Sequence, residues 1–400
     1  MTKLTVRVLL FLGLMGNGVI GSAQSYLHQV FILNEGWSNW QTGEVMEPAT
    51  LGVYDPGLQS YTVADTLENA GFVSDALLRE GQLFVAADGQ LLKYDADTYE
   101  LLASVNVNGI RQLAYANGNI YLTRGDVDAN GMNQPFDAYL QWFNAETLLY
   151  EGELTTAAGP QFATEGIEIV GDVAYIGINN AFDWGNEVGL MGRFDLITEE
   201  YEEWDLGVEG KNPNRLFAAG DAILTVNNRD YGSTSLSVLD ASLETVETVV
   251  VSDANAGCLA AVLDGTTLKY QITGEGQVRA TELSNPAEST VWLADAPGYY
   301  GVALDPTTGD WYGSVTDYST FGFVEIRNAD GVLLNQFDCG VSPGVICMDV
   351  RTAASVIELP QDAGVKGLPV DILGRWAGFN ERKVQVVIDS NGAKTLRFEE

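Results

Sequence analysis

Short stretches of alternating apolar and polar residues, separated by Gly, Asp and Asn, run along most of the chain. Alternation with a period of two predicts half-buried β-strands, and frequent β-branched residues favour strands over helices. The pattern is clearest between Phe72 and Val107. We label the four strands of such a set A, B, C and D, and here they are predicted over Val73–Leu78, Leu83–Ala87, Leu91–Tyr94 and Leu101–Val107.

Strand C of each set ends in an Asp or Asn that begins a turn. The clear copies end at Asp55, Asp95, Asn144, Asp195, Asp240 and Asn328. Their intervals of 40, 49, 51, 45 and 88 residues indicate that the last interval hides a degenerate copy, near Ser284-Asn285-Pro286. A period in the forties with four short strands per unit is typical of a β-propeller. The later blades are predicted at about 110–156, 162–208, 212–252, 257–294 and 299–340.

The first and last strands of the pattern each lack a partner. Val30–Asn34 resembles a B strand with no A strand before it, and C and D strands follow near Leu51–Tyr54 and Tyr61–Ala64. Gly344–Val350 resembles an A strand with no B strand after it. Joining the two completes one blade and closes the ring, which removes exposed sheet edges. The sequence therefore predicts an all-β, seven-bladed propeller over residues 24–352.

The two ends of the chain differ from the repeats. Lys3 and Arg7 precede the apolar run Val8–Met15, and the small residues Gly21-Ser22-Ala23 follow, so residues 1–23 are predicted to be a secretory signal peptide. Residues 353–400 are predicted to form a small β-tail, with strands near Val370–Arg375, Lys383–Ile388 and Thr395–Phe398. This tail is either a secretion or sorting segment or a β-hairpin on the flank of the propeller.

Some local sequences resemble a known family. The segment Phe31-Ile-Leu-Asn-Glu-Gly36, and repeats such as Gly118–Leu122 followed by Phe143–Thr147, resemble YncE-like seven-bladed propellers secreted by Bacteroidetes-type bacteria. The wider group includes surface propellers that capture cobalamin beside a transporter, so the resemblance implies a corrinoid among the candidate ligands and an outer-membrane transporter as a candidate partner. Asp371-x-x-Gly-Arg375 and the terminal strands resemble the sorting domain of type IX secretion, but the usual first half, with a Pro-Asn-Pro motif, is absent.

Charge and composition narrow the classes of function. The chain has 55 acidic and 20 basic residues, a formal net charge of −35, so nucleic acids and anionic lipid surfaces are poor partners. No later segment has the length and apolarity of a membrane span. His28 is the only His, which excludes a His-dependent triad and a multi-His metal centre. Cys339 and Cys347 could pair in an oxidising compartment, which would leave Cys258 unpaired.

The B–C loops and D–A links of a propeller share one face, and here that face is rich in aromatic, Arg, Asn and Asp residues. Such a mixture offers apolar contact area together with directional hydrogen bonds, as a recognition surface requires. Packing between loops is the structural alternative for each aromatic residue. The predicted ligand-binding residues are Trp37, Trp40, Arg111, Arg124, Glu165, Asn180, Asp183, Trp184, Asn214, Arg215, Asn228, Arg229, Tyr231, Tyr300, Asp317 and Tyr318.

One short segment has the spacing of a calcium loop. Asp126, Asp128 and Asn130 precede Gly131, and Asp137 stands where such loops usually carry Glu. The shorter reach of Asp weakens the match. The segment is therefore predicted either to bind calcium through Asp126, Asp128, Asn130 and Asp137 or to be a solvated Asp/Asn/Gly turn.

These observations predict a secreted or cell-surface binding protein, with a periplasmic location as the alternative. The ligand classes are a small organic molecule, a corrinoid, a glycan or a protein. Catalysis finds little support, because carboxylates are so numerous that no single pair is informative. The alternatives are a carboxylate-dependent extracellular glycosidase or lyase, which requires a central pocket with two carboxyl groups, and a structural or adhesive surface module.

Overall fold

The computed structural model describes residues 24–352, except positions 40, 41, 43, 69, 129, 241, 243, 244, 256, 258 and 259, together with the backbone of 355–356, 384–388 and 394–398. The predicted signal peptide, Trp40 and Cys258 lie outside these residues. The chain divides into a compact unit over Leu27–Val350 and a second unit formed by Met1–Tyr26 and Arg351–Glu400.

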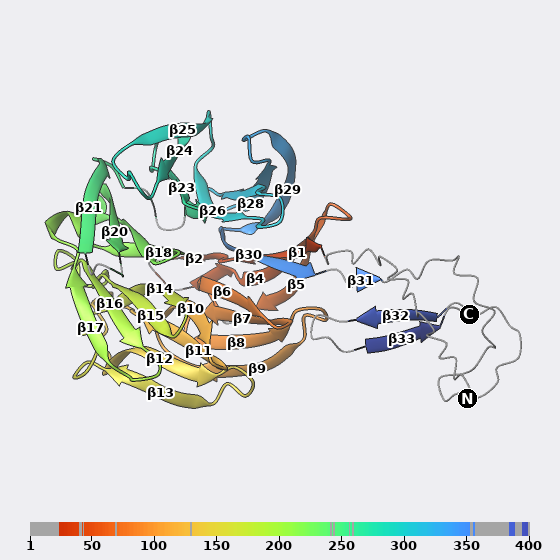
Figure 1. The fold of residues 1–400 in the computed structure, drawn as a ribbon, viewed down its shortest axis with the longest axis horizontal. Helices are drawn as coiled ribbons and strands as arrows, with labels where there is room; N and C mark the ends of the chain where they lie inside the picture. Colours follow the sequence, from red (N-terminus) through yellow and green to blue (C-terminus); the bar gives the residue numbers. More distant parts are fainter. Residues whose placement is uncertain are drawn as a thin grey trace, which may run out of the picture. The chain divides into compact units, whose positions relative to one another are not determined.

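Seven four-stranded antiparallel sheets follow one another around a ring (Figure 1). Their order matches the predicted repeats, and the fold is a seven-bladed β-propeller. Blades 1 to 4, given from inner to outer strand, are β30 (Pro343–Thr352), β1 (Ser25–Asn34), β4 (Ala49–Asp55) and β5 (Ser60–Leu67); β6 (Val73–Arg79), β7 (Gln82–Ala87), β8 (Gln90–Asp95) and β9 (Leu101–Asn106); β10 (Ile110–Ala116), β11 (Asn119–Arg124), β12 (Ala138–Asn144) and β13 (Tyr150–Thr155); and β14 (Thr164–Val170), β15 (Val173–Ile178), β16 (Leu190–Asp195) and β17 (Tyr201–Asp205). Blades 5 to 7 are β18 (Pro213–Ala219), β19 (Ala222–Asn227), β20 (Thr234–Asp240) and β21 (Thr245–Ser252); β22 (Ala261–Asp264), β23 (Thr267–Gln271), β24 (Gln277–Glu282) and β25 (Ser289–Ala294); and β26 (Tyr299–Leu304), β27 (Trp311–Val315), β28 (Phe321–Arg327) and β29 (Leu333–Val341).

The ring closes in the predicted way, by pairing of the first and last strands of the repeat pattern. β30, drawn in blue, lies beside the red β1 as the inner strand of blade 1 (Figure 1). The side chain of Gln29 in β1 donates to Asp349 in β30 at 2.9 Å. Tyr54 of blade 1 stacks on Phe337 of blade 7, with ring centroids 4.1 Å apart. The pairing of β30 with β1 completes blade 1 and covers an edge of β1 that would otherwise be exposed.

The core lies between neighbouring blades, and the period of two in the sequence places it there. In β7, Leu83 and Val85 pack into the core shared with blade 1, while Phe84 and Ala86 pack into the core shared with blade 3. Successive residues of a strand point to opposite faces of its sheet. A strand such as β7 therefore contributes to two cores, and this dependence on both neighbouring blades explains why the blades require a closed ring.

The repeated Asp/Asn positions form the turns between strands C and D. The Oδ1 atom of Asp95 accepts hydrogen bonds from the backbone N–H groups of Asp97 and Thr98, at 3.0 and 2.8 Å. This local bonding pattern is the reason that Asp and Asn are favoured at such turns. The side chains of Asp55, Asn144, Asp195, Asp240 and Asn328 accept backbone N–H groups in the same way. The degenerate copy near Asn285 lies in the turn between β24 and β25.

The inner strands share an irregularity near the end where the B–C loops lie. In blade 2, Val73 and Asp75 are opposite the adjacent residues Ala87 and Ala86, so Ser74 is an additional residue in β6. Such β-bulges change the direction in which side chains point and are frequent next to functional sites. Equivalent register shifts occur in four further inner strands, and the residues within the five shifts are Ser74, Arg111, Gln112, Glu165, Gly166, Asn214, Tyr300 and Gly301.

Several shorter elements accompany the blades. A hairpin of β2 (Trp37–Asn39) and β3 (Glu44–Glu47) follows β1, and two 3-10 turns, η1 (Val208–Gly210) and η2 (Arg229–Tyr231), belong to blade 5. In the second unit, β31 (Ser355–Val356), β32 (Val384–Ile388) and β33 (Lys394–Phe398) form one sheet, so the two terminal strands predicted for the tail are present. The predicted strand at Val370–Arg375 lies outside the described residues.

The two described cysteines are free thiols, so the pairing left open by the sequence is not formed. Cys339 packs in the core between blades 7 and 1, whereas Cys347 packs against the core between blades 1 and 2. The two thiols therefore belong to different packing layers, although only seven residues separate them in the sequence.

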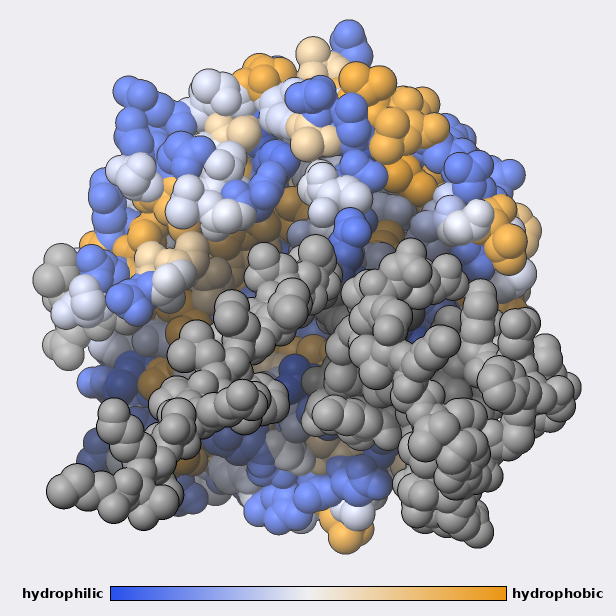
Figure 2. Space-filling model, turned by 45° about the vertical axis from the view of Figure 1, so that its right-hand side comes forward, coloured by the Kyte–Doolittle hydropathy of each residue, from blue (hydrophilic) through white to orange (hydrophobic). Residues whose placement is uncertain are grey.

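The outer surface carries exposed apolar side chains on outer strands, among them Leu101 and Leu102 of β9 and Leu333 and Leu334 of β29. Apolar residues form separate patches between polar ones on the face drawn in Figure 2. Within the part of the chain that the structure describes, no helix is long and apolar enough to cross a membrane.

Candidate ligand-binding site

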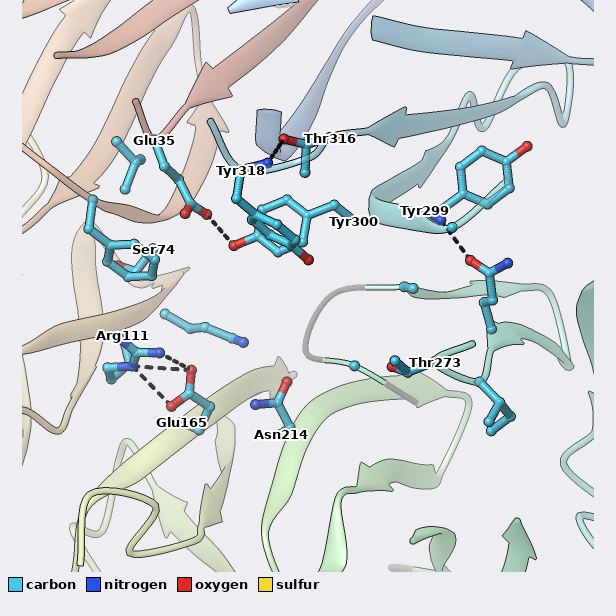
Figure 3. Close-up of a pocket in the computed structure, with 18 of the residues that line it drawn as sticks. Glu35, Ser74, Arg111, Glu165, Asn214, Thr273, Tyr299, Tyr300, Thr316 and Tyr318 are labelled. Carbon is cyan, nitrogen blue, oxygen red and sulfur yellow. Dashed lines mark hydrogen bonds and ion pairs between the residues drawn. The ribbon is translucent and has the colours of Figure 1, made fainter. Parts of the chain in front are cut away.

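A cavity of about 510 Å³ opens at the end of the ring where the B–C loops and D–A links meet. Every blade contributes to its lining, mostly through the first residues of an inner strand or the last residues of a B strand. Figure 3 shows the polar side chains of this cavity converging from separate blades on one space. The lining residues used below are Glu35, Phe72, Ser74, Arg111, Gln112, Glu165, Asn214, Gln271, Thr273, Tyr299, Tyr300 and Tyr318.

Arg111 and Glu165 form an ion pair across blades 3 and 4. The Nε and Nη2 atoms of Arg111 donate to the two carboxylate oxygens of Glu165, at 3.0 and 2.8 Å. The guanidinium group also lies over the rings of Phe72 and Phe182, 5.6 and 5.2 Å from their centroids. A bidentate pair of this kind is directional and satisfies both charges. Glu165, only 6% exposed, is thereby neutralised inside the protein.

Glu35 lies in the same cavity without such a pair. It follows β1, is 8% exposed, and accepts a hydrogen bond of 2.8 Å from the hydroxyl of Tyr300. Burial raises the pKa of Glu35 to about 7, although the hydrogen bond from Tyr300 and the positive charge of Arg111 act in the opposite direction. The carboxylate fits beside Gly344 because a Cβ atom there would lie 2.2 Å from Glu35 Oε1. Glu35 therefore titrates near neutral pH inside the cavity.

Asn214 has an unused hydrogen-bonding group. It is the additional residue in the bulge of β18 and is 9% exposed, and its Oδ1 atom is buried with no hydrogen-bond partner among the described residues. A buried polar atom left unpaired costs roughly 1–3 kcal/mol, so native proteins usually provide a partner. Figure 3 shows the Asn214 side chain directed toward the cavity. A donor group of a bound molecule would satisfy this oxygen.

A second group of charged side chains lies on inner strands near the cavity. Burial raises the pKa of Asp75 to about 6 and that of Glu168 to about 7, and the charge of Arg215 lowers both. Asp75 also accepts a hydrogen bond from the backbone N–H of Leu113, which joins blade 2 to blade 3. In this group, as in the cavity lining, two acidic side chains accompany one basic side chain. The cavity and its surroundings are therefore acidic.

The structure brings some of the predicted ligand-binding residues together and separates others. Those that line the cavity are Arg111, Glu165, Asn214, Tyr300 and Tyr318. Arg215 lies nearby on β18, with its guanidinium 5.8 Å from the ring centroid of Phe217. Trp40 lies outside the described residues, and Trp37 lies in the β2–β3 hairpin.

The remaining predicted residues make contacts within one loop or between neighbouring loops. Trp184 is 69% exposed and its ring centroid lies 5.0 Å from that of Tyr231. The guanidinium of Arg124 is buried over Phe136 at 3.9 Å, where it donates to two backbone carbonyl groups. Further contacts join Asn180 and Asp183 to Asn186, Asn228 to the backbone of Gly257, Arg229 to Glu209, and Asp317 to the backbone of Ser319 and Thr320.

Sequence reasoning missed several lining residues, including Glu35, Ser74, Gln112, Gln271 and Thr273. Glu35 belongs to the segment that resembles YncE-like propellers, and no local pattern marks it as a lining residue. Position in the repeat is the signal that could identify them. The lining residues lie near the starts of strands A, where the bulges are, and at the ends of strands B. Glu165-Gly166 and Tyr300-Gly301 also share a Gly after the lining residue, and a Cβ at either glycine would collide with the neighbouring inner strand or its side chains.

The predicted calcium loop is a tight turn in this structure. One carboxylate oxygen of Asp128 accepts the backbone N–H groups of Asn130 and Met132, at 2.8 and 3.0 Å. Val127 and Asn133 pair as an isolated β-bridge. Among the described residues, no three His, Cys, Asp or Glu side chains lie close enough together to hold a metal ion. Calcium binding through Asp126, Asp128, Asn130 and Asp137 stays a prediction.

The fold has counterparts among solved structures. A hypothetical selenium-binding protein of Sulfolobus tokodaii is similar with a TM-score of 0.56 and 13% identity, over 82% of this chain and 93% of that one. A candidate 6-phosphogluconolactonase of Bacteroides fragilis is similar with a TM-score of 0.53 and 12% identity, over 80% and 98%. None of the protein-family models matches the sequence, and no curated protein matches it. At such low identities these similarities establish the fold alone.

Proposed function

We propose that this chain is a non-enzymatic binding protein that captures a small organic molecule in the cavity lined by Glu35, Asn214 and Tyr300, where the B–C loops and D–A links meet. The observation that carries the proposal concerns Asn214, which lines the cavity. Its Oδ1 atom is buried and has no hydrogen-bond partner among the described residues. It shares the cavity with the Glu35 carboxylate and with the rings of Phe72, Tyr300 and Tyr318. A concave site with apolar walls and a few fixed polar groups is typical of small-molecule binding.

The wider proposal is that the mature protein is secreted and belongs with the YncE-like propellers. The charged residues and apolar run before Gln24 support export, and the tail is proposed to act as a sorting segment. N-terminal sequencing of the exported protein tests the first part, with cleavage before Gln24 expected. Retention of residues 1–23 in the exported protein would contradict it.

A ligand screen tests the binding function and its location. The full mature chain is screened by thermal shift against small organic molecules, corrinoids and oligosaccharides, because a ligand that binds only the folded state raises the melting temperature. We expect Asn214→Ala and Tyr318→Ala to weaken binding of the ligand found by about tenfold each. Trp184→Ala is the matched control, since it removes an exposed aromatic from a B–C loop outside the cavity lining. Equal losses in all three variants would move the site to the outer loops.

One observation favours a second function, an acid–base enzyme such as a glycosidase or lyase. Glu35 has a pKa raised to about 7 and shares its cavity with a second carboxylate, Glu165. Groups that titrate near the working pH are suited to proton transfer. If the cavity is catalytic, Glu35→Gln abolishes turnover of a bound substrate while its binding persists. A ligand recovered chemically unchanged after prolonged incubation supports the binding function instead.

A further inference from the structure

The charges of the cavity are unequal. Its charged lining residues, among those the structure describes, are Glu35, Glu165 and Arg111. Arg111 is held by both oxygens of Glu165, so its positive charge is largely compensated there and acts on Glu35 only as a weaker, more distant influence. Glu35 has the hydroxyl of Tyr300 as its side-chain donor, and within the part of the chain that the structure describes it forms no equivalent ion pair. An ionised Glu35 is therefore a buried negative charge that a cation bound beside it would stabilise.

The hydrogen-bonding groups point to the same kind of ligand. Asn214 presents a buried carbonyl oxygen without a donor, and Glu35 presents a carboxylate. Both groups require N–H or O–H donors from whatever binds between them. A carboxylate or phosphate ligand would supply only acceptors and would meet Glu35 with the same sign of charge.

The walls of the cavity suit a cation that carries apolar groups. Phe72, Tyr300 and Tyr318 are among the lining residues, and the rings of Tyr300 and Tyr318 meet edge to face with centroids 5.2 Å apart. Aromatic faces attract cations, most strongly where water is excluded. The net charge of −35 also raises the local concentration of cations around the molecule.

We propose that the cavity takes a small organic cation, a protonated amine whose ammonium group lies against the carboxylate of Glu35. This inference rests on the proposed binding function and specifies its ligand class. The ammonium N–H groups donate to Glu35, a further donor group of the natural ligand satisfies Asn214, and the organic part of the ligand contacts the aromatic walls. The Arg111–Glu165 pair remains intact and forms a neutral part of the lining.

Three probes of similar size and different charge test the class: benzylamine, benzyl alcohol and benzoate. Their binding to the full mature chain is measured by calorimetry and by ligand-observed NMR at pH 6, 7 and 8. We expect benzylamine, which stays protonated over this range, to bind at least about tenfold more tightly than benzyl alcohol at pH 8. Its affinity should fall about tenfold between pH 8 and pH 6, because Glu35 takes up a proton over that interval.

Two substitutions connect the effect to Glu35. Glu35→Gln should abolish the preference for benzylamine over benzyl alcohol at every pH. Tyr300→Phe removes the hydrogen bond that lowers the pKa of Glu35, so the midpoint of the pH dependence should move to higher pH. Glu288→Gln is the control, since it removes one exposed carboxylate from the turn between β24 and β25.

The outcomes separate this inference from the binding function itself. If benzyl alcohol or benzoate binds as tightly as benzylamine at pH 8, the cation assignment is overturned and the cavity remains a ligand site. If no probe binds while the wider screen yields a ligand sensitive to Asn214→Ala, the cation assignment is again overturned. A benzylamine preference that survives Glu35→Gln places the cation elsewhere and also overturns the proposal.

Discussion

The turns between strands C and D repeat one hydrogen-bond pattern in blade after blade, whereas the cavity at the other end of the ring is different in every blade. Asp95 and Asn144 each hold two backbone N–H groups in the same geometry. At the cavity, equivalent positions near the starts of the inner strands carry Ser74, Arg111 or Gln112, Glu165, Asn214 and Tyr300. The structure shows this backbone bulge in five of the blades, and the side chains on it differ from blade to blade.

This difference separates what the scaffold requires from what a ligand requires. A turn residue satisfies its own local backbone, so the same residue serves in each blade. A bulge residue points into a cavity that all seven blades line. Which side chain is suitable there depends on the side chains that the other blades contribute. Variation at a structurally repeated position therefore marks the functional end of the ring.

The largest expected effect comes from breaking the ion pair at the cavity. Arg111→Met leaves the Glu165 carboxylate buried without its partner, which should lower the free energy of unfolding by about 3 kcal/mol. Chemical denaturation of the full mature chain measures it.

The control for this prediction is a double variant. Arg111→Met with Glu165→Leu replaces both charges by apolar groups, and we expect it to recover most of the lost stability. A double variant as unstable as Arg111→Met alone would show that packing of the guanidinium between Phe72 and Phe182, and not the charge, is what the cavity requires.

The next effect concerns pH and the buried carboxyls of the inner strands. The pKa of Glu168 rises from 4.5 to about 7 on folding and that of Asp75 from 3.8 to about 6. The folded state therefore holds protons that the unfolded state has released, and stability falls as pH increases between these values. We expect the free energy of unfolding to be lower at pH 8 than at pH 5 by on the order of 2 kcal/mol.

Neutral substitutions distinguish this cause from general charge repulsion. Glu168→Gln combined with Asp75→Asn should reduce the dependence of the melting temperature on pH between 5 and 8, and Glu35 accounts for the slope that remains. Removing two exposed carboxylates from the C–D turn face, by Glu146→Gln and Glu288→Gln, should leave the slope as it was. Identical slopes in both double variants would mean that the buried carboxyls do not control the pH response.

The same comparison explains how far the sequence alone could go. Asp55, Asp95 and their equivalents act through bonds to residues two or three positions away, so local sequence was sufficient to find them and to count seven blades. The closing strand was predictable too, because a strand A and a strand B each lacked a partner. These features depend on hydrogen bonding between near neighbours or on simple pairing.

The cavity was only partly predictable because its residues meet across the ring. Arg111 and Glu165 are 54 positions apart, and Glu35 and Tyr300 are 265 apart. Residue type alone favoured exposed aromatics such as Trp184, which lie on long loops outside the cavity lining. Glu35 carries no local signal of its role, because its raised pKa arises from burial that exists only in the closed ring.

The smallest expected effect comes from a change in one of the repeated turns between strands C and D. Asp95→Ala removes the acceptor for the backbone N–H groups of Asp97 and Thr98, and we expect it to lower the free energy of unfolding by about 1 kcal/mol. Asp95→Asn should cost almost nothing, since an Asn amide oxygen accepts the same bonds at Asn144 in the next blade. Neither variant should change ligand affinity by as much as twofold, because the turn serves only its own backbone. If Asp95→Asn were as destabilising as Asp95→Ala, the negative charge and not the hydrogen bonds would be what the turn selects. If Asp95→Ala instead weakened ligand binding, the two faces would be coupled through the blades, and the separation of scaffold from site would fail.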